Sequence, residues 1–313
     1  MEPSFTFTQP AAVRVMTPDP IDRIADIAHS CYRVEPKTHA ENRQFVGRLI
    51  ADKHLAMLEH YSFHVLCSSF ALDDLRLFNS PFIRYDNLGD HLLISYTLRT
   101  LIENVDTSVP GVRRVIATMC DPLPPEVQEL IPGAISLASP YEPQAVDSAF
   151  IATLPKPIAR RHLWFSYRLT TDRGVTHELV RHRLCSFAQE STRYCNYSKD
   201  RFGNRLVLIR PLDYDEPGRQ AIYDRAFQLA GESYLALLQI GARAQEARAV
   251  LPNALKADLV ISAYLDEWEH IFDLRLRPVA HPECRRVLRL VGSDLVSASP
   301  LFAEDIKELG IEI

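Results

Sequence analysis

The ten residues LWFSYRLTTD at 163–172 narrow the folds open to this chain more than any other stretch. Aromatic and β-branched residues dominate it, and a large apolar residue stands at every second position: Leu163, Phe165, Tyr167 and Leu169. This period of two is typical of a β-strand with one buried face. After the turn residues 172–174, VTHELVRHRL at 175–184 has apolar residues at helical spacing. We therefore predict a strand, a turn and a helix in direct succession.

Other segments predict further strands and long helices. YSFHVLCSSF at 61–70 and RLVLIRP at 205–211 have the composition of strands. Apolar residues recur at helical spacing from 220 until Pro252, and ALKADLVISAYLDEWEHIFDLRL at 254–276 indicates another helix. This mixture of strands and helices predicts an α+β fold.

The stretch between the two main strands, about 71–160, has a different composition. Eight of the 21 prolines fall within residues 121–159. Because proline interrupts both helices and sheets, we expect an irregular, proline-rich insertion here and not an independent domain. Residues 1–313 are then expected to form a single domain.

Composition excludes several classes of protein. A formal net charge of -5 argues against a general nucleic-acid coat, and no apolar run approaches the roughly 18 residues of a membrane span. The first residues, MEPSFTFTQP, lack the basic and then apolar pattern of a secretion signal. The six cysteines have no CxxC pair or metal-ligand spacing, which predicts free thiols and no metal site. We expect a cytoplasmic protein that does not bind membranes.

Charge is concentrated in one part of the chain. Residues 156–210 contain twelve Lys or Arg against four Asp or Glu, and RHRLCSFAQESTRY at 181–194 holds three of the arginines. Arginine binds phosphate through paired N–H donors, so Arg181, Arg183 and Arg193 suit a phosphorylated ligand. Hydroxyl groups and an amide that could match a pyrimidine edge lie nearby, at Ser191, Thr192 and Gln189.

Other enzyme motifs do not fit the sequence. The two histidines of HELVRH at 177–182 are five residues apart, so a helix would not present them on one side as HExxH does. Neither GxGxxG nor GxxxxGK[ST] occurs, so any flavin or nucleotide must be bound by side chains. Cys185 and Cys195 lie near His182 in the sequence, but no third group is evident that would orient a Cys/His nucleophile.

The order Arg-His-Arg, seven residues, Ser and then Arg-Tyr resembles the signature of the flavin-dependent thymidylate synthases. Further segments are similar to that family in the same order: CYRVE, KHLAMLEHYSFHV, THELVRHR, STRYCNYSKDRFGN, EARAVLP and LRLRPVAHPECR. The resemblance covers most of the chain outside 71–160. It implies a central antiparallel sheet packed with long helices, in a catalytic domain.

The resemblance also implies roles for individual residues. The FAD contacts are expected from His54, Arg181, His182, Arg183, Gln189, Tyr264 and His270. The uridylate pocket is expected to be lined by Glu178, Arg181, Gln189, Glu190, Ser191, Thr192, Arg193, Arg248 and Arg275. Arg275 and Ser191 are the expected catalytic residues: Arg275 would polarise the uracil, and Ser191 would donate a hydrogen bond without acting as a nucleophile.

The implied reaction is reductive methylation of uracil C5 in dUMP, giving dTMP. FAD, NADPH and methylenetetrahydrofolate are the implied cofactors, and a homotetramer with shared active sites is the implied assembly. Several positions depart from the family: Ala56, Ala188, Tyr264 and Asp266. Flavin or sugar contacts are expected to differ there, and Ala188 would leave more room than the asparagine that is frequent in the family. We therefore expect UMP to be accepted as well as dUMP, with a UMP-preferring methylase of a nucleoside-antibiotic pathway as the alternative.

An alternative from another class is a nucleic-acid-binding module. Basic and aromatic residues alternate through Arg193, Tyr194, Tyr197, Lys199 and Arg201, as in proteins that stack on single-stranded nucleic acid. The compact Arg-His-Arg cluster favours a mononucleotide ligand, and the enzyme interpretation is therefore preferred.

Overall fold

The computed structural model describes residues 4–31, 37–133, 138–199 and 203–313. Its central sheet has the strand order β2-β7-β10-β8, with every neighbouring pair antiparallel. The strands are β2 (Ala11–Arg14), β7 (Trp164–Asp172), β10 (Lys256–Tyr264) and β8 (Ser186–Gln189). β7 and β10 pair over nine residues, from Lys256 opposite Asp172 to Tyr264 opposite Trp164. The strand predicted at 163–172 is thereby confirmed.

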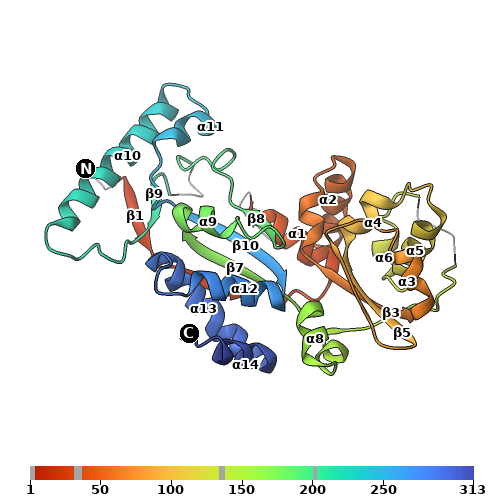
Figure 1. The fold of residues 1–313 in the computed structure, drawn as a ribbon. Coiled ribbons are helices and arrows are strands. Elements are labelled where there is room, and N and C mark those ends of the chain that lie inside the picture. The colour runs from red at the N-terminus through yellow and green to blue at the C-terminus, as the bar shows by residue number, and fades with distance from the viewer. Residues whose placement is uncertain (1–3, 32–36, 134–137, 200–202) are drawn as a thin grey trace.

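Helices cover both faces of this sheet (Figure 1). One face packs on α8 (Lys156–His162), α9 (Arg173–Leu179), α12 (Leu265–Arg275), α13 (Pro282–Ala298) and α14 (Pro300–Glu308). α13 buries Cys284, Val287, Leu288, Val291 and Leu295, whose spacing of three or four residues places them along one side of a helix. On the other face, Ile27 of α1 (Pro20–Ser30) packs with Ala188 and Val260. The predicted α+β fold with a central antiparallel sheet is confirmed.

The prediction of a helix over 254–276 is wrong in its first half. Residues Lys256–Tyr264 form β10, and only Leu265–Arg275 form the helix α12. β10 lies between β7 and β8 and is buried on both faces. Its sequence is therefore a nearly continuous apolar run and lacks the alternation of apolar and polar residues that marks a half-buried strand. The helix predicted at 175–184 also ends early, at Leu179, because residues 186–189 pair with β10.

A small two-stranded sheet lies at one end of the central sheet. β1 (Phe5–Thr8) pairs in parallel with β9 (Leu206–Ile209), and α10 (Arg219–Gln239) packs against them. The helix predicted from 220 to Pro252 breaks at Gly241, which has φ +97°. The amides of Gly241 and Ala242 donate to carbonyls of the last turn, a cap that favours glycine. α11 (Ala244–Ala247) and a 3-10 turn (Arg248–Val250) follow.

The expectation of an irregular insertion over 71–160 is wrong. A second antiparallel sheet has the order β4-β5-β3-β6 and a core of its own, which includes Val65, Leu92, Ile94, Ile116 and Met119. Its strands are β3 (Ser62–Ser68), β4 (Ile83–Asn87), β5 (His91–Thr97) and β6 (Gln144–Ala145). The helices and 3-10 turns between residues 39 and 152 are α2 (His39–Ala51), Leu55–Glu59, Ser69–Ala71, α3 (Leu72–Leu75), α4 (Leu98–Asn104), α5 (Pro110–Cys120), α6 (Pro125–Gln128) and α7 (Ser148–Ala152).

Proline misled the prediction because several prolines stand in the first turn of a helix. α6 begins at Pro125, and Pro157 is the second residue of α8, where the missing N–H of proline leaves no intrahelical bond unmade. Figure 1 shows this second sheet and its helices on one side of the central sheet, with α10 on the other. Across the four described ranges, no helix is both long and apolar enough to cross a membrane.

Candidate active site

The segment 181–194 wraps around one edge of the central sheet. It leaves the end of α9, forms the edge strand β8 and then turns at 191–194. β8 pairs with β10, with Gln189 opposite Leu259. This path divides the predicted site residues into groups that face different surroundings.

The first group surrounds Arg275, at the end of α12. Its Nε donates to Nε2 of His182 at 3.2 Å, and its Nη2 donates to the carbonyl oxygen of Glu178 at 2.9 Å. Nη1 forms an ion pair with the Glu178 carboxylate at 3.2 Å. The ring of His270, one turn earlier on α12, lies edge to face with His182 at 5.6 Å between ring centroids. Four residues predicted from separate segments therefore meet here.

His182 is buried beside this guanidinium. Burial, and then the charges of Arg275 and His270, lower the pKa of His182 to about 4. The ring is therefore neutral near pH 7, with Nε2 free of a proton to accept from Arg275. The neighbouring Arg181 and Arg183 are exposed, and within the described ranges neither has a hydrogen-bond or ion-pair partner.

The second group lies at the end of β8. The side-chain amide of Gln189 donates to the hydroxyl of Thr176 at 2.8 Å, which ties the strand to α9. Glu190 is 2% exposed and pairs with Nζ of Lys256 at 2.9 Å. The backbone N–H of Asp258 also donates to Glu190, at 3.3 Å. Glu190 thus takes part in a buried ion pair of the sheet, an arrangement that the sequence did not indicate.

The third group follows in the turn 191–194. The amide of Ser191 donates to the carbonyl of Cys31 at 3.1 Å, and Thr192 is buried. Arg193 donates from Nε to Gln245 at 3.1 Å and lies over the ring of Tyr194, 5.3 Å from its centroid. Arg248 is exposed on the helical turn that follows Gln245, so two predicted phosphate-binding arginines come from neighbouring segments.

His54 belongs to a separate cavity of about 500 Å³. Tyr194 of the signature segment lines the same cavity, as do Ala56 and Cys31. Residues 32–35 of the CYRVE segment, like Arg201, lie outside the described residues. The cavity therefore brings His54 next to the end of the signature but not to Arg275.

Another cavity, of about 520 Å³, lies beside Glu178. Four carboxylate side chains line it: Asp172, Glu178, Asp213 and Glu283. An acidic lining disfavours a phosphate group, so a nucleotide phosphate is expected at the arginines instead.

Two positions that depart from the family contact the second sheet. Tyr264 is buried, and its hydroxyl shares a hydrogen bond of 3.0 Å with Ser62. Arg84 of β4 lies 4.2 Å from the centroid of the Tyr264 ring and pairs with Asp266 at 2.6 Å. A third departure, Ala188, packs in the apolar cluster beneath α1 and opens no space. Arg84 was missed because its segment was taken as irregular.

The cysteines give no support to a thiol nucleophile. All six are free, as predicted, and Cys185 and Cys195 are both buried. Burial raises the pKa of the Cys185 thiol far above its ordinary range, so it stays protonated near pH 7.

The fold and these side chains define an α+β protein whose candidate site is built at the edge of an antiparallel sheet. Residues 158–301 match the family described as thymidylate synthase complementing protein. The matched range includes the whole of 181–194 together with Arg248, His270 and Arg275, whereas His54 lies outside it. Over this range the chain is similar to flavin-dependent thymidylate synthases.

Individual relatives are similar over the same part of the chain. A flavin-dependent thymidylate synthase from Geobacter sulfurreducens is 36% identical over 123 residues, which cover 38% of this chain and 52% of that protein. One from Corynebacterium efficiens is 34% identical over 151 residues, covering 43% and 58%. The chain thus spans about half the length of the curated relatives that it matches.

A solved structure of the UMP/dUMP methylase PolB from Streptomyces cacaoi, bound with 5-Br UMP, overlaps 52% of this chain and 82% of that chain. The sequence identity is 24% and the TM-score is 0.43.

Proposed function

We propose that this protein methylates C5 of uridine 5'-monophosphates, converting dUMP to dTMP and accepting UMP as well. FAD, NADPH and methylenetetrahydrofolate are the proposed cofactors. Kinship over 158–301 supports the proposal, since the signature and Arg275 both fall within the matched range. The observation that carries it is the guanidinium of Arg275, held between His182 and Glu178, with an exposed arginine on either side of His182 in the sequence.

The side chains suit an anionic dinucleotide cofactor. Arg181 and Arg183 offer exposed guanidinium groups, the donors that bind diphosphates in pairs. His54, Gln189 and His270 supply further polar groups, and His182 orients Arg275 by accepting a hydrogen bond from it. When bound, FAD would supply the hydride that completes the methyl group. Tyr264 is the weakest of the proposed FAD contacts because its hydroxyl already bonds Ser62.

The nucleotide would be held mainly by arginines. Arg193 and Arg248 are both exposed and come from neighbouring segments, as a phosphate site requires. Ser191 and Thr192 lie between Gln189 and Arg193 and would donate to the phosphate or the base. Glu190 would not contact the nucleotide but would fix the end of β8 through its ion pair with Lys256.

Arg275 would provide the electrostatic part of the catalysis. A fixed positive charge beside the uracil O2 and N3 stabilises electron density that develops in the ring as C5 becomes nucleophilic. His182 accepts from Nε and Glu178 accepts from the other nitrogens, so the guanidinium is held before the substrate arrives. No thiol nucleophile is required, in keeping with the burial of Cys185.

We also propose a homotetramer with shared active sites. The cavity that contains His54 and the cavity beside Glu178 have no lining residue in common. In an oligomer, the residues around one of these cavities in one copy of the chain could lie beside the other cavity in a neighbouring copy. Light scattering should give the mass of a tetramer, and a monomer that is fully active at nanomolar concentration would contradict this.

Binding of FAD tests the cofactor assignment directly. Titration of the purified protein should give binding at micromolar FAD. The double variant Arg181→Gln/Arg183→Gln should weaken binding at least about tenfold, since two charge-assisted contacts are lost. Arg113→Gln/Arg289→Gln, which removes two exposed arginines elsewhere, is the matched control. A folded protein that fails to bind FAD would count against the whole proposal.

A further inference from the structure

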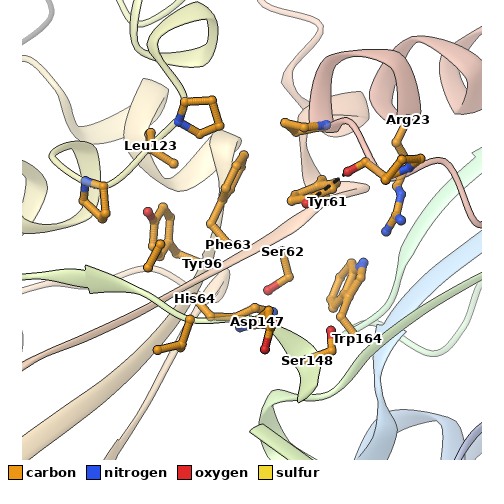
Figure 2. A pocket seen from close by; sticks show the side chains of 16 residues that line it. Arg23, Tyr61, Ser62, Phe63, His64, Tyr96, Leu123, Asp147, Ser148 and Trp164 are labelled. Atoms are coloured by element: carbon orange, nitrogen blue, oxygen red, sulfur yellow. Dashed lines mark hydrogen bonds between the residues drawn. The ribbon is translucent and has the colours of Figure 1, made fainter. Parts of the chain in front are cut away.

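A cavity of about 410 Å³ opens between β3 of the second sheet and β7 of the central sheet (Figure 2). Its volume is within the range of roughly 300–1,000 Å³ that is usual for small-molecule sites. Among its lining residues only Trp164 falls within 158–301, the range shared with the family. We call it the aromatic cavity after the rings that line it: Tyr61, Phe63, Tyr96 and Trp164.

The walls of the aromatic cavity are rigid and largely apolar. The rings of Tyr61 and Phe63 lie 4.8 Å apart, and Phe63 stacks on Tyr96 at 5.7 Å. Four prolines complete the lining: Pro18, Pro20, Pro122 and Pro124. Aromatic and proline side chains lose little conformational entropy when a ligand binds, so this lining favours a flat, rigid ring.

Arg23 supplies a positive charge at one end of the aromatic cavity. It lies over the ring of Tyr61, 4.9 Å from the centroid, and its Nε donates to the carbonyl of Thr17 at 2.6 Å. Within the described ranges no carboxylate pairs with this guanidinium, and its terminal nitrogens have no acceptor. Burial lowers the pKa of Arg23, as expected for a cation that lacks a counter-charge.

Two further polar groups remain available to a ligand. Nε1 of Trp164 is a buried donor without a partner among the described residues. A buried donor left unpaired costs free energy that a ligand acceptor would recover. Asp147, which accepts from the amide of Phe150 at the start of α7, lines the cavity away from Arg23 (Figure 2). Its carboxylate could accept from an N–H at the opposite edge of the ligand.

His64 does not compete with Arg23 for an anion. It lines the same cavity, but its Nδ1 is hydrogen-bonded with Ser95 at 2.6 Å. Burial lowers the pKa of His64 to about 3, so the ring is neutral near pH 7. Among the residues that line the cavity, all of them described, Arg23 therefore carries the one positive charge.

We propose that the aromatic cavity is a second ligand site, for a planar aromatic acid. The ring would lie among Tyr61, Phe63 and Trp164, with its negative group on Arg23 and an N–H donor facing Asp147. None of the residues that line the cavity is a proposed FAD or nucleotide contact, and the inference does not depend on the proposed methylation. The floor of the cavity contacts Tyr264, because Ser62 bonds its hydroxyl and Trp164 packs edge to face on its ring at 4.7 Å.

The chain has two tryptophans, which makes binding directly visible. Full-length protein labelled with 5-fluorotryptophan should give one ¹⁹F signal for Trp164 and one for Trp268, assigned with the variant Trp164→Phe. Trp268 is fully buried in the core of the central sheet. Titration with 6-amino-2-naphthoate should shift the Trp164 signal and leave the Trp268 signal in place.

The neutral analogue 6-amino-2-naphthamide should bind at least about tenfold more weakly, because it cannot form a charge-assisted contact with Arg23. Arg23→Gln should weaken naphthoate binding by a similar factor. The matched control is Arg48→Gln, which removes an arginine that lies over another ring, that of Phe45. Binding to this control should be unchanged.

A second variant covers the case in which Arg23→Gln does not fold. Ala145 is exposed at the edge of the aromatic cavity, so Ala145→Phe would fill the cavity without removing a core contact. It should abolish the shift of the Trp164 signal. The proposal is overturned if millimolar naphthoate leaves that signal unmoved, if the amide binds as tightly as the acid, or if Ala145→Phe binds normally. FAD binding and methylation would be unaffected by such a result, so the two proposals fail separately.

Discussion

Arg275 donates from Nε to Nε2 of His182, 3.2 Å away, a contact that a protonated histidine could not make. The contact requires a neutral ring, with its proton on Nδ1. Burial and the adjacent charges of Arg275 and His270 lower the pKa of His182 to about 4 and keep it in that form. The histidine therefore orients the arginine without adding a second positive charge, and the ion pair of Arg275 is with Glu178.

Removal of this charge should slow the chemical step. Arg275→Ala should lower single-turnover methylation on the order of 100-fold, as does the loss of one donor at an oxyanion site. Arg277→Ala is the matched control, since Arg277 is exposed nearby and pairs with Asp273. A rate for Arg275→Ala within about fivefold of the wild-type rate would show that Arg275 takes no part in the chemical step.

Cysteine variants should stay active. Cys185 and Cys195 are buried and the Cys185 thiol is protonated near pH 7, so Cys185→Ala and Cys195→Ala should keep turnover within a few-fold. Single-turnover assays on protein whose FAD and nucleotide binding have been verified decide the matter. Loss of activity in a variant that still binds both would revive covalent catalysis.

The buried pair between Lys256 and Glu190 should contribute strongly to stability. Lys256→Met would remove a buried positive charge that pairs with Glu190, 2% exposed, and with Asp258. We expect the free energy of unfolding to fall by about 3–5 kcal/mol, measured by urea denaturation. Arg243→Met, which breaks an exposed pair with Glu246, should cost less than about 1 kcal/mol. Equal losses in the two variants would contradict the burial of the pair.

Stability should decrease as the solution becomes acidic. His60 is buried with its Nδ1 hydrogen-bonded with Ser262 at 2.7 Å, and burial lowers its pKa to about 4. The unfolded chain, with a histidine pKa of about 6.5, binds a proton that the folded chain excludes. The free energy of unfolding should therefore fall as pH decreases from about 6.5 to about 4. Urea denaturation across this range should give a shallower slope for His60→Gln. A wild-type stability that rises toward low pH would be inconsistent with a neutral, buried His60.

Sugar selectivity should be weak. The departures that might have opened space are engaged elsewhere, since Ala188 packs beneath α1 and Tyr264 bonds Ser62. The expectation of weak selectivity therefore rests on a general property of binding pockets: a pocket rejects a ligand with one added hydroxyl only weakly unless it is built to do so. The ratio of kcat/KM for dUMP and UMP should lie below about 1,000-fold, or about 4 kcal/mol. A larger preference for dUMP would mean that the pocket actively excludes the 2'-hydroxyl.

The sequence predicted the elements whose patterns are local. The alternation at 163–172 identified β7, and the Arg-His-Arg signature identified His182, which contacts Arg275. β10 was taken as a helix because a strand buried on both faces loses its period of two. The second sheet was missed because prolines at the starts of helices, such as Pro125 of α6 and Pro157 of α8, resembled those of a loop.

The pairing of side chains within the site could not be predicted from sequence. Lys256 lies 66 residues from Glu190, and Arg84 lies 182 residues from Asp266. Such contacts depend on strand register and on how the two sheets meet, which no local pattern encodes. The aromatic cavity has the same origin, because its rings come from β3, β5 and β7.

Formation of a C5-methylated nucleotide tests the central claim most directly. Purified protein, FAD, NADPH and isotope-labelled methylenetetrahydrofolate should convert dUMP, and UMP as well, to a product that carries the label, detected by mass spectrometry. Omission of NADPH or FAD should abolish the product. Folded protein that binds FAD and nucleotide, yet transfers no label to either uridylate, would contradict the proposed function.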